Sequence, residues 1–120
     1  MEQRHRNLLH PLTMKTYRAL WSLSRSNAVE AIVLQNTIGE IELTYGAPGQ
    51  YGGSLAGAFP MDKTIFKAYT TAVSDVDGPI SIWVQPVSAD GFGLVTMANG
   101  QYTDQIMQMG TVGIEITVDP

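Results

Sequence analysis

The stretch from Glu30 to Phe59 constrains the fold most, because three short apolar runs alternate there with two clusters of turn-forming residues. In the middle run, Ile41, Leu43 and Tyr45 alternate with polar residues, which is the period-two pattern of a half-buried strand. The two clusters, rich in Gly, Asn and Pro, have the composition of tight turns. The stretch therefore predicts a three-stranded antiparallel meander, against which the remainder of the chain packs.

Further strand patterns follow at intervals of about 8–12 residues, separated by polar or glycine-containing turns. Residues 29–35 form an almost continuous apolar run, which is typical of a strand covered on both faces. The clearest alternation lies at 111–118, and other strands are expected over 64–73, 79–87 and 92–97. Because no helix separates consecutive strands, the sequence predicts an all-β fold. We expect an antiparallel β-sandwich or small barrel of about seven to nine short strands, with an extended N-terminal arm.

Three segments are less regular. Residues 14–24 fit either a helix or a strand, and their aromatic and threonine content favours a strand. Residues 102–109 fit either a loop or a distorted strand. The glycines within 50–59 predict a bent or bulged strand, because glycines inside strands mark bulges or close approaches of the backbone. Asn27 is expected to adopt a positive φ in the turn that follows residue 24.

Length and charge define the domain organisation. A chain of 120 residues is long enough for one domain. Residues 1–25 carry five basic residues and one acidic residue, whereas residues 26–120 carry two basic and ten acidic residues, which gives +4 and −8. We therefore predict a basic N-terminal arm over 1–13 and a single β-sandwich domain over 14–120. Such an arm either docks on the acidic surface of a neighbouring copy or of a different protein, or remains a solvated terminus.

No set of residues indicates catalysis or a cofactor. The chain has no cysteine, which excludes disulfides, thiolate zinc sites and thiol nucleophiles. Asp75 and Asp77 begin like a calcium loop, but the glycine arrives too early and the twelfth position is a proline. Glu40 and Glu42 lie about 7 Å apart on one predicted strand face, where we interpret them as solubilising side chains. The sequence therefore predicts a protein that is not an enzyme and that binds no metal or cofactor.

Charge and the lengths of the apolar runs also limit the classes of partner. An acidic body is atypical of a nucleic-acid-binding protein, which shows a basic face. No apolar run approaches the length of a membrane span. We therefore expect neither a nucleic acid nor a membrane as the partner. The aromatic residues are interpreted mainly as core or subunit-interface residues.

Residues 36–45, followed by 49–60, resemble a small β module of virion structural proteins of tailed bacteriophages. The matching residues are Asn36, Thr37, Gly39, Tyr45, Gly49, Tyr51, Gly53, Leu55, Gly57, Phe59 and Ile114 to Ile116. The resemblance covers about residues 15–60 and the last strand, and consists of turn and packing residues. It implies a non-enzymatic structural component of a phage particle, such as a capsid decoration, head fibre or tail accessory protein. It also implies a location in the virion, with copies of the chain itself and other virion proteins as partners.

Two functional hypotheses follow. In the first, the chain is a homo-oligomeric building block whose arm contacts a neighbour. The predicted assembly-interface residues are Arg4, His5, Arg6, His10 and Trp21. In the alternative, the chain is a receptor- or glycan-binding β module at a fibre tip, in which aromatic residues such as Trp83 or Tyr51 line an exposed groove.

Overall fold

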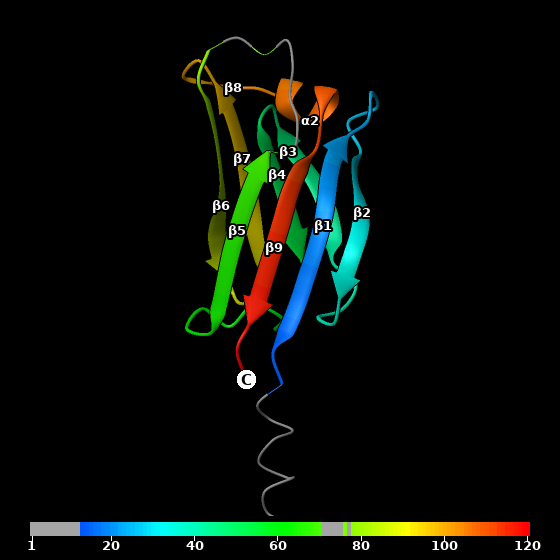
Figure 1. Cartoon of the computed structure of the whole chain (residues 1–120), viewed down its shortest axis with the longest axis vertical. Helices are drawn as coiled ribbons and strands as arrows, with labels where there is room; N and C mark the ends of the chain where they lie inside the picture. Colours follow the sequence, from blue (N-terminus) through cyan, green and yellow to red (C-terminus); the bar gives the residue numbers. More distant parts are fainter. Residues whose placement is uncertain (1–12, 71–75, 77) are drawn as a thin grey trace, which may run out of the picture.

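Two antiparallel β-sheets pack face to face in the computed structural model, which describes residues 13–70, 76 and 78–120 (Figure 1). Sheet A has the strand order β2-β1-β9-β5, and sheet B has the order β3-β4-β7-β6, with β8 paired to β7. The strands are β1 (Lys15–Leu23), β2 (Val29–Asn36), β3 (Glu42–Ala47), β4 (Gln50–Ser54), β5 (Thr64–Thr70), β6 (Ile80–Ser88), β7 (Gly91–Ala98), β8 (Gln101–Tyr102) and β9 (Val112–Val118). The prediction of an all-β sandwich is therefore confirmed.

Strands β1 and β9 form the centre of sheet A and show the period of two most clearly. In β1 the side chains of Tyr17, Ala19, Trp21 and Leu23 are buried, and the residues between them are partly exposed. The burial of β9 follows from its alternation of Val and Ile with smaller or polar residues. The strand assignment for residues 14–24 is therefore confirmed over the helical alternative.

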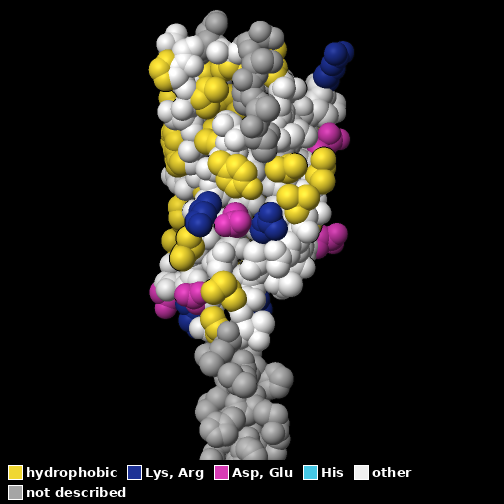
Figure 2. Space-filling model, viewed as in Figure 1, with side chains coloured by type: hydrophobic (Ala, Val, Ile, Leu, Met, Phe, Trp, Pro, Cys, Tyr) yellow, Lys and Arg dark blue, Asp and Glu magenta, His cyan; other side chains and the backbone are white. Residues whose placement is uncertain are grey.

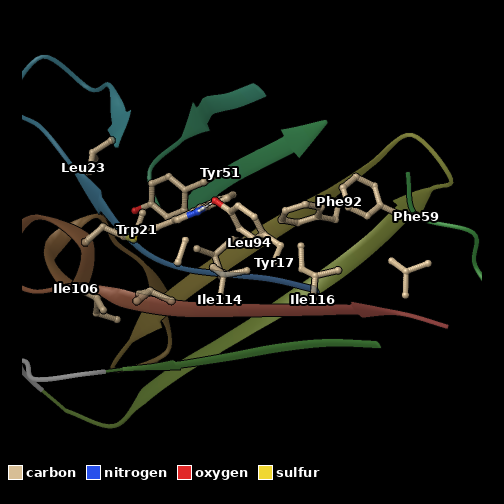
Figure 3. Packing of buried hydrophobic residues seen from close by; sticks show 14 residues of the cluster. Tyr17, Trp21, Leu23, Tyr51, Phe59, Phe92, Leu94, Ile106, Ile114 and Ile116 are labelled. Carbon is tan, nitrogen blue, oxygen red and sulfur yellow. Dashed lines mark hydrogen bonds between the residues drawn. The ribbon is translucent and has the colours of Figure 1, made fainter. Parts of the chain in front are cut away.

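The core is built around a chain of aromatic rings between the sheets (Figure 3). The rings of Trp21 in β1 and Phe92 in β7 stack with centroids 5.8 Å apart. The indole Nε1 of Trp21 donates a hydrogen bond of 3.0 Å to the hydroxyl of Tyr17, so its polar atom is satisfied inside the core. Phe59 contacts Phe92 edge to face at 5.3 Å.

Each end of the sandwich is closed by a non-strand segment. At one end, the short helix α2 (Gln105–Met109) buries Ile106 and Met107 between the sheets (Figure 1). At the other end, the fully buried Phe59 lies in the connection between β4 and β5. The backbone N–H of Phe59 donates to the carbonyl of Ala89 in the β6–β7 turn. Sheet A and sheet B are thus connected to each other at both ends of the sandwich.

The predicted three-stranded meander is wrong in one pairing. The β3–β4 hairpin forms as expected, with Gly49 at φ +73° in its turn. Strand β2, however, pairs with β1 in sheet A and not with β3. The reason is local: Asn27, at φ +62°, closes a tight β1–β2 hairpin. The turn after β2, in which the Asn36 side chain binds the N–H of Ile38 and Gly39, then takes the chain across to sheet B.

The glycine-rich segment 50–59 differs from the predicted bulged strand. Strand β4 is regular and ends at Ser54, and the register shift lies in its partner β3, between Tyr45 and Ala47. The expected close approach does occur, because a Cβ added to Gly53 would lie 2.5 Å from the ring of Phe92.

Within residues 102–109, the expectation of a loop or a distorted strand is wrong for the last five residues, which form the helical turn α2. The helix has five residues and no side-chain cap, so it shows none of the usual sequence signals. Its position follows from burial of Ile106 and Met107 at the end of the sandwich. Asp75 and Asp77, the predicted strand residues 71–73 and the arm up to residue 12 lie outside the described residues.

Candidate functional site

The open edge of sheet A carries three consecutive apolar residues. Ile32, Val33 and Leu34 in β2 are 62%, 51% and 52% exposed. The expectation that this strand is covered on both faces is therefore wrong for the single chain. The physical reason is its position, because among the described residues β2 pairs with β1 alone and leaves its other edge open.

The outward-facing side chains of sheet A continue this apolar surface across all four strands. The pairing registers place Tyr69, Gly113, Leu20 and Ile32 in one row. Gly113 points outward and is nevertheless buried, because the ring of Tyr69 lies against it. Figure 2 shows the resulting yellow band across the sheet. We call this outward surface, together with the β2 edge, the sheet A face.

A charged row runs beside the apolar row. Glu115 in β9 lies between Lys67 in β5 and Arg18 in β1. Its carboxylate oxygens lie 3.7 Å from Nζ of Lys67 and 3.5 Å from Nε of Arg18. Figure 2 shows the row as blue, magenta and blue below the yellow band. Both signs of charge are therefore present within the face, and the row keeps a net charge of +1.

The inward side of β2 borders an opening between the two sheets. This opening between β2 and β3 has a volume of about 470 Å³. Apolar side chains of Ala31, Val33, Ile41 and Leu43 line it, with Glu40 among the polar residues. Strand β2 thus presents apolar side chains both to the outer face and to the opening.

The β2 edge also has few of the features that usually prevent strands from pairing between molecules. Exposed edges are commonly protected by lysine, proline or a bulge. Strand β5, the other edge of sheet A, carries Lys67 at its centre, and β6 carries Pro86 beside a register shift. Strand β2 has neither lysine nor proline, although its register with β1 shifts so that Leu34 has no directly opposed residue. It is therefore the least protected of these three edges.

A cluster of hydrogen-bonded polar groups lies at the α2 end of the sandwich. The carboxylate of Asp104 accepts hydrogen bonds from the hydroxyls of Tyr45 and Tyr51, each at 2.7 Å, and from the backbone N–H of Gly49 at 2.8 Å. Burial raises the pKa of Tyr51, and the hydrogen bond to Asp104 raises the pKa of Tyr45. Both phenols are thus held as proton donors. The cluster attaches the α2 segment to the β3–β4 hairpin.

A pocket of about 530 Å³ lies at the end of the sandwich opposite α2, beside Met14, Lys63 and Asp119. Among the described residues, no group of three or more His, Asp or Glu side chains is placed to hold a metal ion. No helix in the described part of the chain has both the length and the hydropathy needed to cross a membrane.

The predicted interface residues fall into two groups. Trp21 is fully buried and contributes to the core, so it is not a surface contact residue. The reason is that it shares its strand face with the other buried residues of β1. Arg4, His5, Arg6 and His10 lie outside the described residues. Of the two aromatic residues proposed for a groove, Trp83 is exposed and Tyr51 is buried.

The sequence reasoning missed the residues that form the sheet A face, which are Leu20, Ile32, Leu34, Ile65 and Tyr69. The sequence signal for the β2 part of this face is the almost continuous apolar run at 29–35, from which we expect a strand inside the molecule. No comparable signal distinguishes Tyr69 from a core tyrosine. Comparisons of the chain with protein-family models, with curated proteins and with solved structures found no match.

Proposed function

We propose that the chain is a non-enzymatic building block that associates with further copies of itself through the sheet A face. One observation carries the proposal: β2 has the sequence of a strand covered on both sides, but Ile32, Val33 and Leu34 are each more than half exposed. Exposed apolar surface of this kind marks interaction sites in soluble proteins. A neighbouring chain supplies the cover that the single chain lacks.

A second copy suits this surface for two reasons. The row of Lys67, Glu115 and Arg18 carries a net charge of only +1, so two identical faces repel each other only weakly. An unpaired strand edge is also self-complementary, because two copies of β2 related by a two-fold axis run antiparallel. Pairing of this kind brings the apolar residues of both β2 strands together and removes both edges from water.

The resemblance of residues 36–60 to virion structural proteins of tailed bacteriophages supports a setting for this assembly. In this setting the chain is a structural component of a phage particle, as a capsid decoration, head fibre or tail accessory protein. Its partners are copies of itself and other virion proteins. Mass spectrometry of purified particles tests this setting separately from self-association, because it reports whether the chain is present in the particle.

Self-association is tested by replacing Ile32 with glutamate. The substitution Ile32→Glu places a charge in the centre of the proposed contact, and the residue is exposed enough for the fold to tolerate it. The matched control is Val87→Glu, because Val87 is 68% exposed and lies on an edge strand of the other sheet. Light scattering coupled to size-exclusion chromatography gives the mass of each variant over a range of protein concentrations.

We expect the unsubstituted chain and Val87→Glu to form the same oligomer, and Ile32→Glu to run as a monomer with an unchanged circular dichroism spectrum. Two results would contradict the proposal. One is a monomeric unsubstituted chain at every concentration. The other is equal dissociation by both glutamate variants, because the contact would then not be specific to sheet A.

A further inference from the structure

The outer face of sheet B has a different chemical character from the sheet A face. Strands β4, β6, β7 and β8 together contain no Asp, Glu, Lys, Arg or His. Their outward positions hold glycine, glutamine, serine, two large aromatic residues, and the apolar Val95 and Met97. In sheet B, Glu42 at the β3 edge is the single charged strand residue. A ligand of this face is therefore selected by stacking and by neutral hydrogen bonds.

Two exposed aromatic side chains flank strand β7 on this face. Trp83 in β6 lies opposite Val95 and is 40% exposed. Tyr102 in β8 lies opposite Met97 and is 53% exposed. Strands β6 and β8 lie about 10 Å apart across β7, and the two residues are offset by two positions, or about 7 Å, along the strands, so their Cα atoms are about 12 Å apart. This spacing suits an elongated ligand that contacts both rings.

The residue between the two aromatic strands is apolar. Val95 points outward and is only 7% exposed, and Trp83 in β6 and Gln50 in β4 lie directly opposite it. The next row contains Gly93 and Gly52, which lie opposite each other. A Cβ added to Gly93 would find its nearest atoms at 3.6 Å or more, which is ordinary van der Waals contact, whereas the Oγ1 of Thr44 lies close against Gly52.

Neutral polar side chains lie beside these residues. Gln50 lies opposite Val95, Gln85 lies opposite Gly93, and Ser81 lies opposite Met97. All three are exposed, and within the described part of the chain their side chains form no hydrogen bond. The amides of the two glutamines and the hydroxyl of Ser81 each donate and accept hydrogen bonds, so these side chains can pair with the hydroxyl groups of a ligand in either role.

We propose that the outer face of sheet B binds a neutral oligosaccharide, with sugar rings stacked on Trp83 and Tyr102. A pyranose ring has an apolar C–H face, which packs on an aromatic ring, and hydroxyl groups at its edge, which pair with amides. The absence of charge from the four strands favours an uncharged sugar over a sulfated or sialylated one. This site lies on the opposite side of the sandwich from the sheet A face and is independent of self-association.

The two tryptophans of the chain make binding measurable without a label. Trp21 is fully buried and Trp83 is exposed, so a change in tryptophan fluorescence on adding a sugar reports on Trp83. The probes are neutral oligomers of hexose and of N-acetylhexosamine, first on an array that also carries sialylated and sulfated glycans, and then in solution by isothermal titration calorimetry, which also measures the Trp83 variants that lack the fluorescence signal. The variants are Trp83→Ala, Trp83→Phe and Tyr102→Ala, with Tyr69→Ala as the control on sheet A.

We expect a neutral oligosaccharide to bind, with affinity reduced about tenfold or more in Trp83→Ala and in Tyr102→Ala. Trp83→Phe retains a ring and is expected to keep part of the affinity, whereas Tyr69→Ala leaves it unchanged. The proposal is overturned if no neutral glycan binds the folded chain, or if only charged glycans bind. It is also overturned if Trp83→Ala and Tyr102→Ala bind as tightly as the unsubstituted chain.

Discussion

The hydroxyl of Tyr51 donates a hydrogen bond of 2.7 Å to Oδ1 of Asp104, which lies 53 positions later in the chain. The same carboxylate binds Tyr45 and the N–H of Gly49. Asp104 immediately precedes α2, the segment that closes one end of the core. These hydrogen bonds therefore join the closing segment to the β3–β4 hairpin of sheet B.

Substitution Asp104→Ala is expected to lower the free energy of unfolding by about 2–4 kcal/mol. It removes a charged acceptor of three hydrogen bonds and leaves the hydroxyl of Tyr51 without this partner. Tyr51→Phe removes one of these bonds and is expected to cost about 1 kcal/mol. Urea unfolding, followed by circular dichroism, measures both changes.

The control for this prediction is Asp62→Ala, because Asp62 is exposed and forms no hydrogen bond or ion pair among the described residues. Its stability is expected to equal that of the unsubstituted chain. Equal stabilities for Asp104→Ala and Asp62→Ala would show that the cluster does not hold the α2 segment in place.

The tyrosines of the interior predict a loss of stability at alkaline pH. Burial raises the pKa of Tyr17 and Tyr51 above the ordinary value of 10.0, and the hydrogen bond to Asp104 raises the pKa of Tyr45. Above pH 10 the tyrosines of the unfolded chain therefore lose their protons at a lower pH than the same tyrosines in the folded chain. The contribution of these groups to stability is therefore complete below about pH 10 and falls as the pH rises further.

The urea midpoint measured from pH 8 to about pH 12 checks this direction. Tyr51→Phe removes one of the late-ionising groups, so its stability is expected to fall less steeply in the alkaline range. A stability that stays constant up to about pH 12, or that falls equally in both proteins, would contradict the assignment.

The contact between Tyr69 and Gly113 predicts a way to alter the sheet A face without changing its charge. A Cβ at position 113 would overlap the ring of Tyr69, so Gly113→Ala is expected to displace that ring. Alanine is compatible with the extended backbone of β9. It also lowers the conformational entropy of the unfolded chain, which stabilises the fold and offsets the cost of moving the Tyr69 ring. We therefore expect weaker self-association with little change in stability.

Light scattering of Gly113→Ala, compared with Tyr69→Ala, measures the effect on association. If the ring is the important element, both variants shift the monomer–oligomer equilibrium in the same direction. An unchanged equilibrium in both would show that the contact between copies does not include this part of the face.

Regular alternation made much of the fold predictable. The period of two in β9 and β1 reflects a constraint within each strand, because every second side chain must enter the core. The α2 helix was not predictable in the same way. Its Ile106 and Met107 are buried by segments distant in sequence, and neither a cap nor a helical period marks its ends.

The candidate surfaces were less predictable, because sequence does not specify which chain covers an apolar residue. The apolar run in β2 correctly predicts a strand, but the prediction that other parts of the same chain cover both faces of this strand is wrong. Trp21 and Trp83 both lie in apolar strands. Trp21 shares its face with buried residues, whereas Trp83 lies between the inward-facing Ile82 and Val84. The phase of β6 that holds Trp83 also holds Ser81 and Gln85, so the alternation within this strand does indicate that Trp83 lies at the surface.

The contact between Gly53 and Phe92 predicts a site in the core that does not tolerate a methyl group. A Cβ on Gly53 would lie 2.5 Å from Cζ of Phe92 and 3.0 Å from Cγ2 of Ile41. The Phe92 ring has little room to move, because three other rings pack around it. We expect Gly53→Ala to lower the free energy of unfolding by about 1–3 kcal/mol.

Gly93→Ala is the matched control for this effect of crowding. Gly93 lies in the neighbouring strand β7, and an added Cβ would find no atom closer than 3.6 Å. Both positions have extended backbone, so the two substitutions differ mainly in the space available to the new methyl group. Urea unfolding of the two variants should therefore separate them, with Gly93→Ala close to the unsubstituted chain. Equal losses of stability would mean that the glycines are required for the backbone of sheet B and not for the packing of Phe92.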